Sequence, residues 1–105
     1  MTLSRYFKET LKARIDQDSG VRAALLEEAV DCLLAGELDV GKSVLRDYVN
    51  STIGFQELGA LTAKSPKSLM RMLSSQGNPQ ARNLFEIIRL LQQREGVRLK
   101  VTATH

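Results

Sequence analysis

The chain has 105 residues, of which 43% are hydrophobic, 26% charged and only 5% aromatic, with no tryptophan. This length and balance predict one ordinary globular domain with a modest aliphatic core. The formal net charge of +3 is unevenly distributed. Residues 1–52 hold 7 Lys+Arg and 9 Asp+Glu, a net of −2, whereas residues 53–105 hold 8 Lys+Arg and 3 Asp+Glu, a net of +5. The basic second half favours a polyanionic partner without proving one.

Several classes of protein are excluded by simple counts. The single cysteine, Cys32, excludes an intrachain disulfide framework and a cysteine-cluster zinc site. The apolar runs are too short for a membrane-spanning helix, and the segment MTLSRYFKET lacks the apolar core of a signal peptide. We therefore expect a cytoplasmic protein with no membrane association.

The first half of the chain predicts three helices. The first carries an apolar stripe at every fourth position, which is typical of an amphipathic helix. Asp18 or Ser19 is expected to cap a second helix that ends at Gly36, and Asp39 is expected to cap a third helix over VGKSVLRDYVNS. The stripe of the first helix is formed by Leu3, Phe7, Leu11 and Ile15.

Three acidic residues of the second helix, Glu27, Glu28 and Asp31, could be read as a metal or catalytic cluster. No histidine accompanies them, so a solvated helix face is the better interpretation. The only histidine, His105, ends the sequence, and no serine, cysteine or aspartate lies beside a suitable base. We expect neither an enzyme, nor a metal site, nor a cofactor.

The stretch FQELGALTAKSPKSLMRML predicts a short helix, a tight turn and a second short helix. Ser65 is a good N-cap for that second helix, and Pro66 suits its first position, where an N–H group would have no partner. Gly59 would allow the two helices to approach closely. The expected core positions are Leu58, Leu61 or Thr62, Leu69 and Leu73, with Met72 nearby.

The chain beyond this stretch predicts a loop, one more helix and a strand. In the loop SSQGNP, Gly77 is able to take a left-handed conformation, and Asn78 followed by Pro79 is expected to start the helix QARNLFEIIRLLQQREG, which Gly96 ends. The tail VRLKVTAT alternates apolar and polar residues with the period of a β-strand. A lone strand needs a partner, and the simplest is the same strand of a second copy; a disordered tail is the alternative. The dimerising residues would be Val97, Leu99 and Val101.

Together, these features resemble the lambda-repressor-like (Xre-type) helix-turn-helix proteins, and within them the addiction-module antidote group of HigA-like antitoxins. The match lies in GFQELGALTAKSPKSLMRMLSSQGNPQARNLFEII and in the closing VRLKV, and it covers the second half of the chain well and the first half loosely. It implies a mainly α helix-turn-helix bundle with N-terminal helices and a short C-terminal β-strand. The chain departs from the family pattern at Ala63, where glycine is usual, and at Lys64, where an apolar residue is common.

The resemblance also implies which residues contact DNA. Arg71 is the best candidate to read a guanine, because a guanidinium can bond O6 and N7 together. Lys67 and Ser68 would position the helix on phosphates, and Gln56, Gln76 and Asn78 would contact the backbone. The full set of expected DNA-binding residues is Gln56, Lys64, Ser65, Lys67, Ser68, Arg71, Ser74, Gln76 and Asn78.

We therefore expect an N-terminal helical region, residues 1–52, that packs on or extends a helix-turn-helix region, residues 53–105. The expected function is a homodimeric transcriptional regulator that binds a palindromic operator on double-stranded DNA. The resemblance further implies an antitoxin that represses its own operon and binds a small toxin. Two alternatives stay open: a stand-alone regulator without a toxin, and a protein-interaction module that does not bind DNA.

Overall fold

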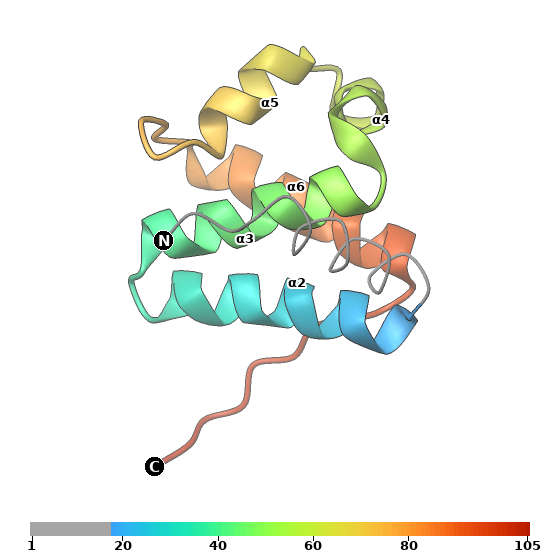
Figure 1. The fold of residues 1–105 in the computed structure, drawn as a ribbon. Coiled ribbons are helices and arrows are strands. Elements are labelled where there is room, and N and C mark those ends of the chain that lie inside the picture. The colour runs from blue at the N-terminus through green and yellow to red at the C-terminus, as the bar shows by residue number, and fades with distance from the viewer. Residues whose placement is uncertain (1–17) are drawn as a thin grey trace, which may run out of the picture.

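The computed structural model describes residues 18–105, so the predicted first helix lies outside the described part of the chain. The described residues form five helices: α2 (Ser19–Leu34), α3 (Leu38–Ser51), α4 (Gly54–Thr62), α5 (Pro66–Met72) and α6 (Ala81–Glu95). α2 packs along α3, while α4 and α5 lie on the other side of α3 and α6 (Figure 1). None of these helices is both long and apolar enough to cross a lipid bilayer.

One hydrophobic core joins all five helices. Its side chains recur every three or four residues along each helix, the spacing that brings them onto one face. Cys32 of α2 is also buried, and this burial, followed by the nearby carboxylate of Glu28, raises the pKa of its thiol. The core residues are Leu26, Ala29, Leu45, Tyr48, Val49, Phe55, Leu58, Leu69, Leu73, Ile87, Ile88 and Leu91.

The start of α2 is as the sequence predicts, whereas the start of α3 is not. The Asp18 carboxylate accepts hydrogen bonds from the amides of Gly20 and Val21, at 2.8 and 3.3 Å, and so acts as the N-cap of α2. The prediction that Asp39 caps α3 is wrong, because α3 begins at Leu38 and Asp39 lies inside its first turn. There the carboxylate is still favourable beside the positive end of the helix dipole.

In the loop between α5 and α6, one further prediction is wrong and one possible conformation is not adopted. Asn78 does not cap α6, which begins at Ala81 after an extended Gln80 whose side chain makes no cap hydrogen bond. The residue before a proline avoids the helical region, so Asn78–Pro79 leads into the helix from outside it. Gly77 is not left-handed either; among the described glycines only Gly36, Gly54 and Gly96 have positive φ.

The predicted C-terminal β-strand is the main error in the expected fold. The described residues are mainly helical, as predicted, but residues 97–105 form no strand. Val97 and Leu99 instead pack against the protein's own core, and the Leu99 amide donates to the side-chain oxygen of Gln92 at 2.8 Å. An extended chain lying on helices buries alternate side chains just as a strand does, which accounts for the misleading pattern.

Candidate nucleic-acid interface

The candidate interface is built on α4, the turn that follows it, and α5. The Ser65 hydroxyl accepts a hydrogen bond from the Ser68 amide at 3.1 Å, and Pro66 occupies the first helical position, as the sequence predicts. Leu69 and Leu73 are fully buried and fix one side of α5 on the core. With its inner side held in this way, α5 exposes the opposite side to solvent.

The turn itself contains a strained residue. Ala63 has φ 56° and ψ 35°, and it is the one non-glycine residue with positive φ in the described part of the chain. A Cβ atom disfavours this left-handed conformation, which glycine adopts without strain. The Lys64 amide then donates to the Gly59 carbonyl at 3.1 Å and closes the turn.

Gly59 makes this tight turn possible. A Cβ atom at Gly59 would lie 2.7 Å from the carbonyl oxygen of Lys64. Gly59 does permit a close approach, but the group that approaches is the backbone of the turn, whereas the nearest atoms of α5, in Pro66, would lie 3.5 Å or more from that Cβ. At the neighbouring ambiguous position, Thr62 is the buried residue and Leu61 is exposed.

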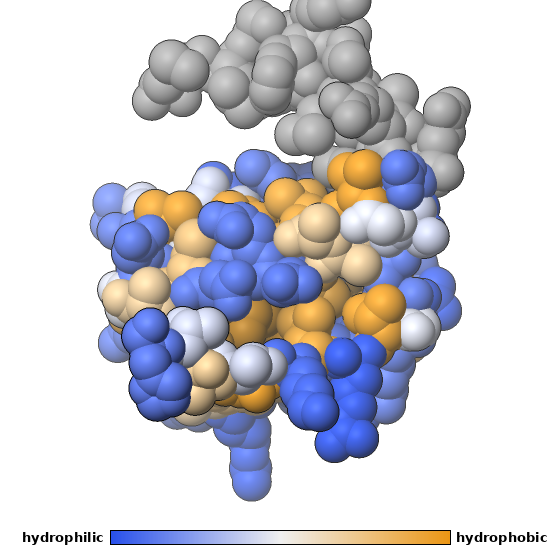
Figure 2. Space-filling model, turned by 90° about the horizontal axis from the view of Figure 1, so that it is seen from below, coloured by the Kyte–Doolittle hydropathy of each residue, from blue (hydrophilic) through white to orange (hydrophobic). Residues whose placement is uncertain are grey.

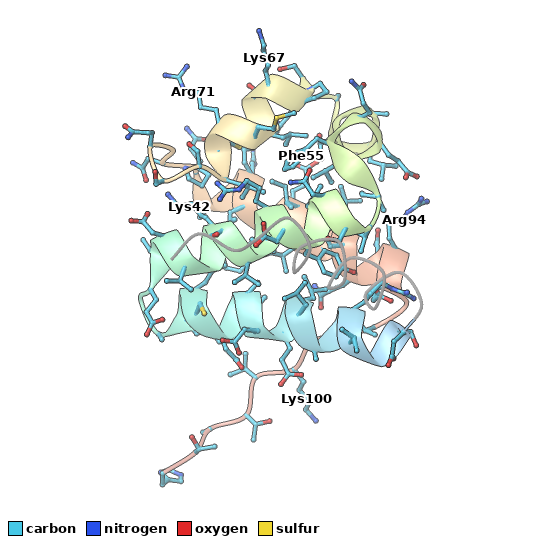
Figure 3. All side chains as sticks on the ribbon, viewed as in Figure 1. Lys42, Phe55, Lys67, Arg71, Arg94 and Lys100 are labelled. Carbon is cyan, nitrogen blue, oxygen red and sulfur yellow. The ribbon has the colours of Figure 1, made fainter. Side chains whose placement is uncertain are left out.

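Most of the predicted DNA-binding residues lie at the surface. Lys67 and Arg71, one helical turn apart on α5, point away from the body of the protein (Figure 3). Lys64 in the turn and Ser74 after α5 are half-buried. The exposed members of the predicted set are Gln56, Ser65, Lys67, Ser68, Arg71, Gln76 and Asn78.

Two of the predicted DNA-binding side chains already form hydrogen bonds within the protein. The Ser65 hydroxyl caps α5, and the Ser74 hydroxyl donates to the Arg71 carbonyl at 2.7 Å. These side chains shape the ends of α5, which limits how freely they can turn toward a ligand. Lys67 and Arg71, in contrast, form no ion pair or side-chain hydrogen bond with any described residue.

The charge of this region has one sign. No aspartate or glutamate occurs between Glu57 and Glu86, so α5 and both of its flanking segments lack acidic residues. Glu57 itself, on α4, forms an ion pair with Arg94 of α6. The exposed side of α5 therefore carries positive charge that no nearby acid of its own segment neutralises.

Two cations of α3 that the sequence analysis did not single out support the far end of α5. The Lys42 amino group, whose side chain is only 7% exposed, donates to the Gly77 carbonyl at 2.7 Å. The Arg46 guanidinium donates to the Leu73 carbonyl at 3.3 Å. Lys42 shares a helix face with the buried Leu45 and Val49, and a lysine on an apolar face was the available signal.

The loop after α5 also packs closely on that helix. A Cβ atom at Gly77 would lie 2.0 Å from the Arg71 carbonyl oxygen and 2.7 Å from that of Met72. Any other residue at this position would therefore displace the loop or the last turn of α5. Gly77 is needed for this close approach, not for a left-handed backbone.

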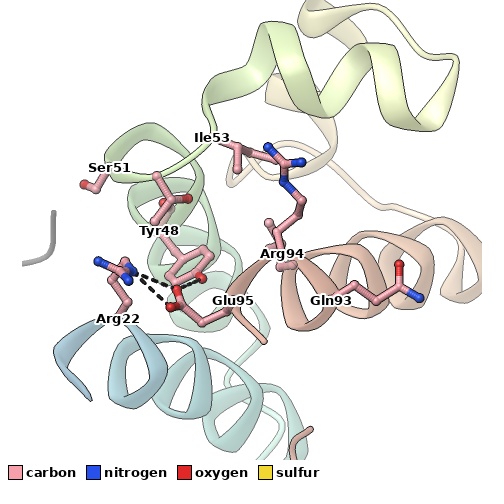
Figure 4. A pocket seen from close by; sticks show the side chains of 9 residues that line it. Arg22, Tyr48, Ser51, Ile53, Gln93, Arg94 and Glu95 are labelled. Carbon is pink, nitrogen blue, oxygen red and sulfur yellow. Dashed lines mark hydrogen bonds and ion pairs between the residues drawn. The ribbon is translucent and has the colours of Figure 1, made fainter. Parts of the chain in front are cut away.

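A separate pocket lies between the start of α2 and the C-terminal ends of α3 and α6 (Figure 4). In it the Glu95 carboxylate, 5% exposed, accepts from Arg22 Nε at 3.0 Å and from the Tyr48 hydroxyl at 2.5 Å. Burial, and then the hydrogen bond to Glu95, raise the pKa of Tyr48 above its usual value. Because its charges are paired, this pocket joins three helices and is a weaker candidate for ligand binding than α5.

The predicted dimerisation residues are placed apart from this interface. The C-terminal segment leaves the protein on the side of α2, away from α5 (Figure 1). Of the three residues, Val97 and Leu99 are partly buried against the core, whereas Val101 is 76% exposed.

Comparison with family models, curated proteins and solved structures finds no match to this chain.

Proposed function

We propose that this protein is a sequence-specific DNA-binding regulator that places the exposed side of α5 in the major groove. The observation that carries the proposal is the pair Lys67 and Arg71, exposed, unpaired among the described residues and fixed on a capped helix. In helix-turn-helix proteins, the short helix that follows a helix and a tight turn lies in the major groove and contacts base edges. The absence of acids from Leu58 to Phe85 supports a polyanionic ligand.

The two cations have different roles in this proposal. Arg71 reads a guanine through its two-pronged guanidinium, so its loss relaxes the preference for one sequence. Lys67 lies one turn earlier and binds phosphate, so its loss weakens binding to all sequences alike. Lys64, Gln56, Gln76 and Asn78 would add contacts to the DNA backbone around α5.

The resemblance of the sequence to HigA-like antitoxins extends the proposal. On that basis the regulator is cytoplasmic, represses its own operon as a dimer on a palindromic operator, and binds a small toxin. The resemblance alone supports this extension. A small basic reading frame directly beside the gene would favour it, and the lack of such a frame would favour a stand-alone regulator.

The proposal is tested by fluorescence anisotropy with a labelled duplex from upstream of the gene and a scrambled duplex of equal length. The affinity should fall steeply with salt, because bound protein releases counterions from the phosphates. Arg71→Ala should weaken binding to the upstream duplex by about 1–3 kcal/mol and remove most of the preference for that duplex over the scrambled one. Lys67→Ala should weaken binding to both and reduce the salt slope by about one.

Arg89→Ala is the matched control, since it removes an exposed cation from α6. Arg89 lies one helical turn after Phe85, on the same exposed side of α6, and it forms no ion pair with a described residue. It should change the binding little beyond the general loss of one charge. If Lys67→Ala and Arg71→Ala both bind like the parent protein, α5 is not the DNA-binding helix.

A further inference from the structure

An apolar groove crosses the side of the protein on which α2 and the C-terminal segment lie. It runs between α2, α6 and residues 98–102. Three large hydrophobic side chains at its borders are strongly exposed: Leu34 (64%), Phe85 (64%) and Val101 (76%). Figure 2 views the protein from this side and shows apolar side chains gathered between charged ones.

The floor of the groove is continuous with the protein's own core. Val30, Ile88 and Leu99 line the groove and also belong to, or pack against, the core cluster. The floor of the groove is therefore made of buried or partly buried side chains from α2, α6 and the C-terminal segment. An apolar surface supported in this way is typical of an interaction site rather than of scattered surface hydrophobic residues.

The two long edges of the groove carry opposite charge. Glu27 and Asp31 of α2 form an acidic edge, and Arg98 and Lys100 of the C-terminal segment form a basic one. All four residues are exposed, and none forms an ion pair with any described residue. Lys100 extends from the C-terminal segment into solvent beside α2 (Figure 3).

We propose that this groove binds the same groove of a second copy of the chain. In a two-fold symmetric pair, each surface meets an identical surface. If the axis runs along the groove, the acidic edge of one copy faces the basic edge of the other, and the exposed apolar borders meet between them. A surface with both charges on opposite edges complements itself, which an all-acidic or all-basic partner surface would not do.

This inference replaces the predicted β-strand pairing with an interface of side chains from α2, α6 and the C-terminal segment. It assigns a role to Leu34 and Phe85, which a strand pair would leave unused. No residue of α5 lines the groove, so a second copy bound in the groove leaves Lys67 and Arg71 uncovered. Association is measured without DNA, and its outcome is therefore independent of the proposed DNA binding.

The test is sedimentation equilibrium of the full chain over a range of concentrations. The parent should associate to dimers. Phe85→Glu and Leu34→Glu should each raise the dissociation constant at least about tenfold, because each places a charge in the apolar contact. Leu61→Glu is the matched control: Leu61 is 44% exposed on α4, outside the groove, and its replacement should leave association unchanged.

A charge-exchange pair tests the symmetric arrangement itself. Replacing Glu27 and Asp31 with lysine makes both edges basic, and replacing Arg98 and Lys100 with glutamate makes both edges acidic. Each double variant should associate at least about tenfold more weakly than the parent, whereas an equimolar mixture should form mixed dimers. A monomeric parent, or double variants that associate like the parent, would overturn the proposal, as would a mixture that forms no mixed dimers.

Discussion

The amino group of Lys42, on α3, donates a hydrogen bond to the backbone carbonyl of Gly77, 35 residues later, at 2.7 Å. This bond joins the first half of α3 to the loop that packs on the end of α5. Since the same loop packs against the Arg71 carbonyl, the position of the proposed reading residue depends on a lysine of another helix. Side chains of α3 thus stabilise the C-terminal end of α5 and the loop after it.

Replacing Lys42 with methionine tests this support. Methionine keeps most of the aliphatic stem but removes the donor, so the Gly77 carbonyl loses its partner. We expect the free energy of unfolding to fall by about 1–2 kcal/mol in urea titrations. Asp39→Asn is the control, because Asp39 is exposed and its pairing with Lys42 at 3.4 Å should contribute less than about 1 kcal/mol. Equal effects of the two substitutions would contradict the role given to the Gly77 carbonyl.

Replacing Ala63 should raise the stability of the protein, whereas replacing Lys42 should lower it. Its left-handed backbone is unfavourable for a residue with a Cβ atom, so Ala63→Gly should raise the free energy of unfolding by up to about 1 kcal/mol. Ala60→Gly, at an exposed position within α4, should instead lower it by about 0.5–1 kcal/mol. Both values come from the same thermal or urea experiment. Destabilisation by Ala63→Gly would show that the strain at this turn is not significant.

The hydrogen bond between Tyr48 and Glu95 predicts a dependence of stability on alkaline pH. At neutral pH, Tyr48→Phe should lower the free energy of unfolding by about 1–2 kcal/mol, because the buried carboxylate loses one donor. The pKa of Tyr48 is raised in the folded protein, so the unfolded chain loses this proton first, near pH 10. The contribution is complete below that pH and decreases above it.

The measurement is urea unfolding of the parent and of Tyr48→Phe between about pH 7 and pH 11, a range that spans the ordinary tyrosine pKa. The difference in stability between the two proteins should be constant up to about pH 9 and then shrink. A difference that persists unchanged to the highest pH would show that the phenolic proton of Tyr48 is not held more tightly in the folded state.

Local signals allowed much of α4 and α5 to be predicted from the sequence. Ser65 and Pro66 mark the start of α5 because capping depends on the residues themselves, and Ala63 could be identified as an unfavourable turn residue. The C-terminal segment was misread because its alternation records which side chains are buried, not what covers them. Lys42 was missed for a similar reason: its partner is a backbone carbonyl in a loop, and no sequence pattern specifies that contact.

The proposal that the exposed side of α5 binds DNA is tested most directly by chemical-shift mapping of the labelled protein. A titration with the upstream duplex should shift the backbone amides of Gln56 and of the non-proline residues among 64–78 most strongly. Amides of the groove, such as those of Leu34, Phe85 and Val101, should shift little, and added salt should reverse the changes. Shifts concentrated in the groove, with residues 64–78 unaffected, would contradict the claim.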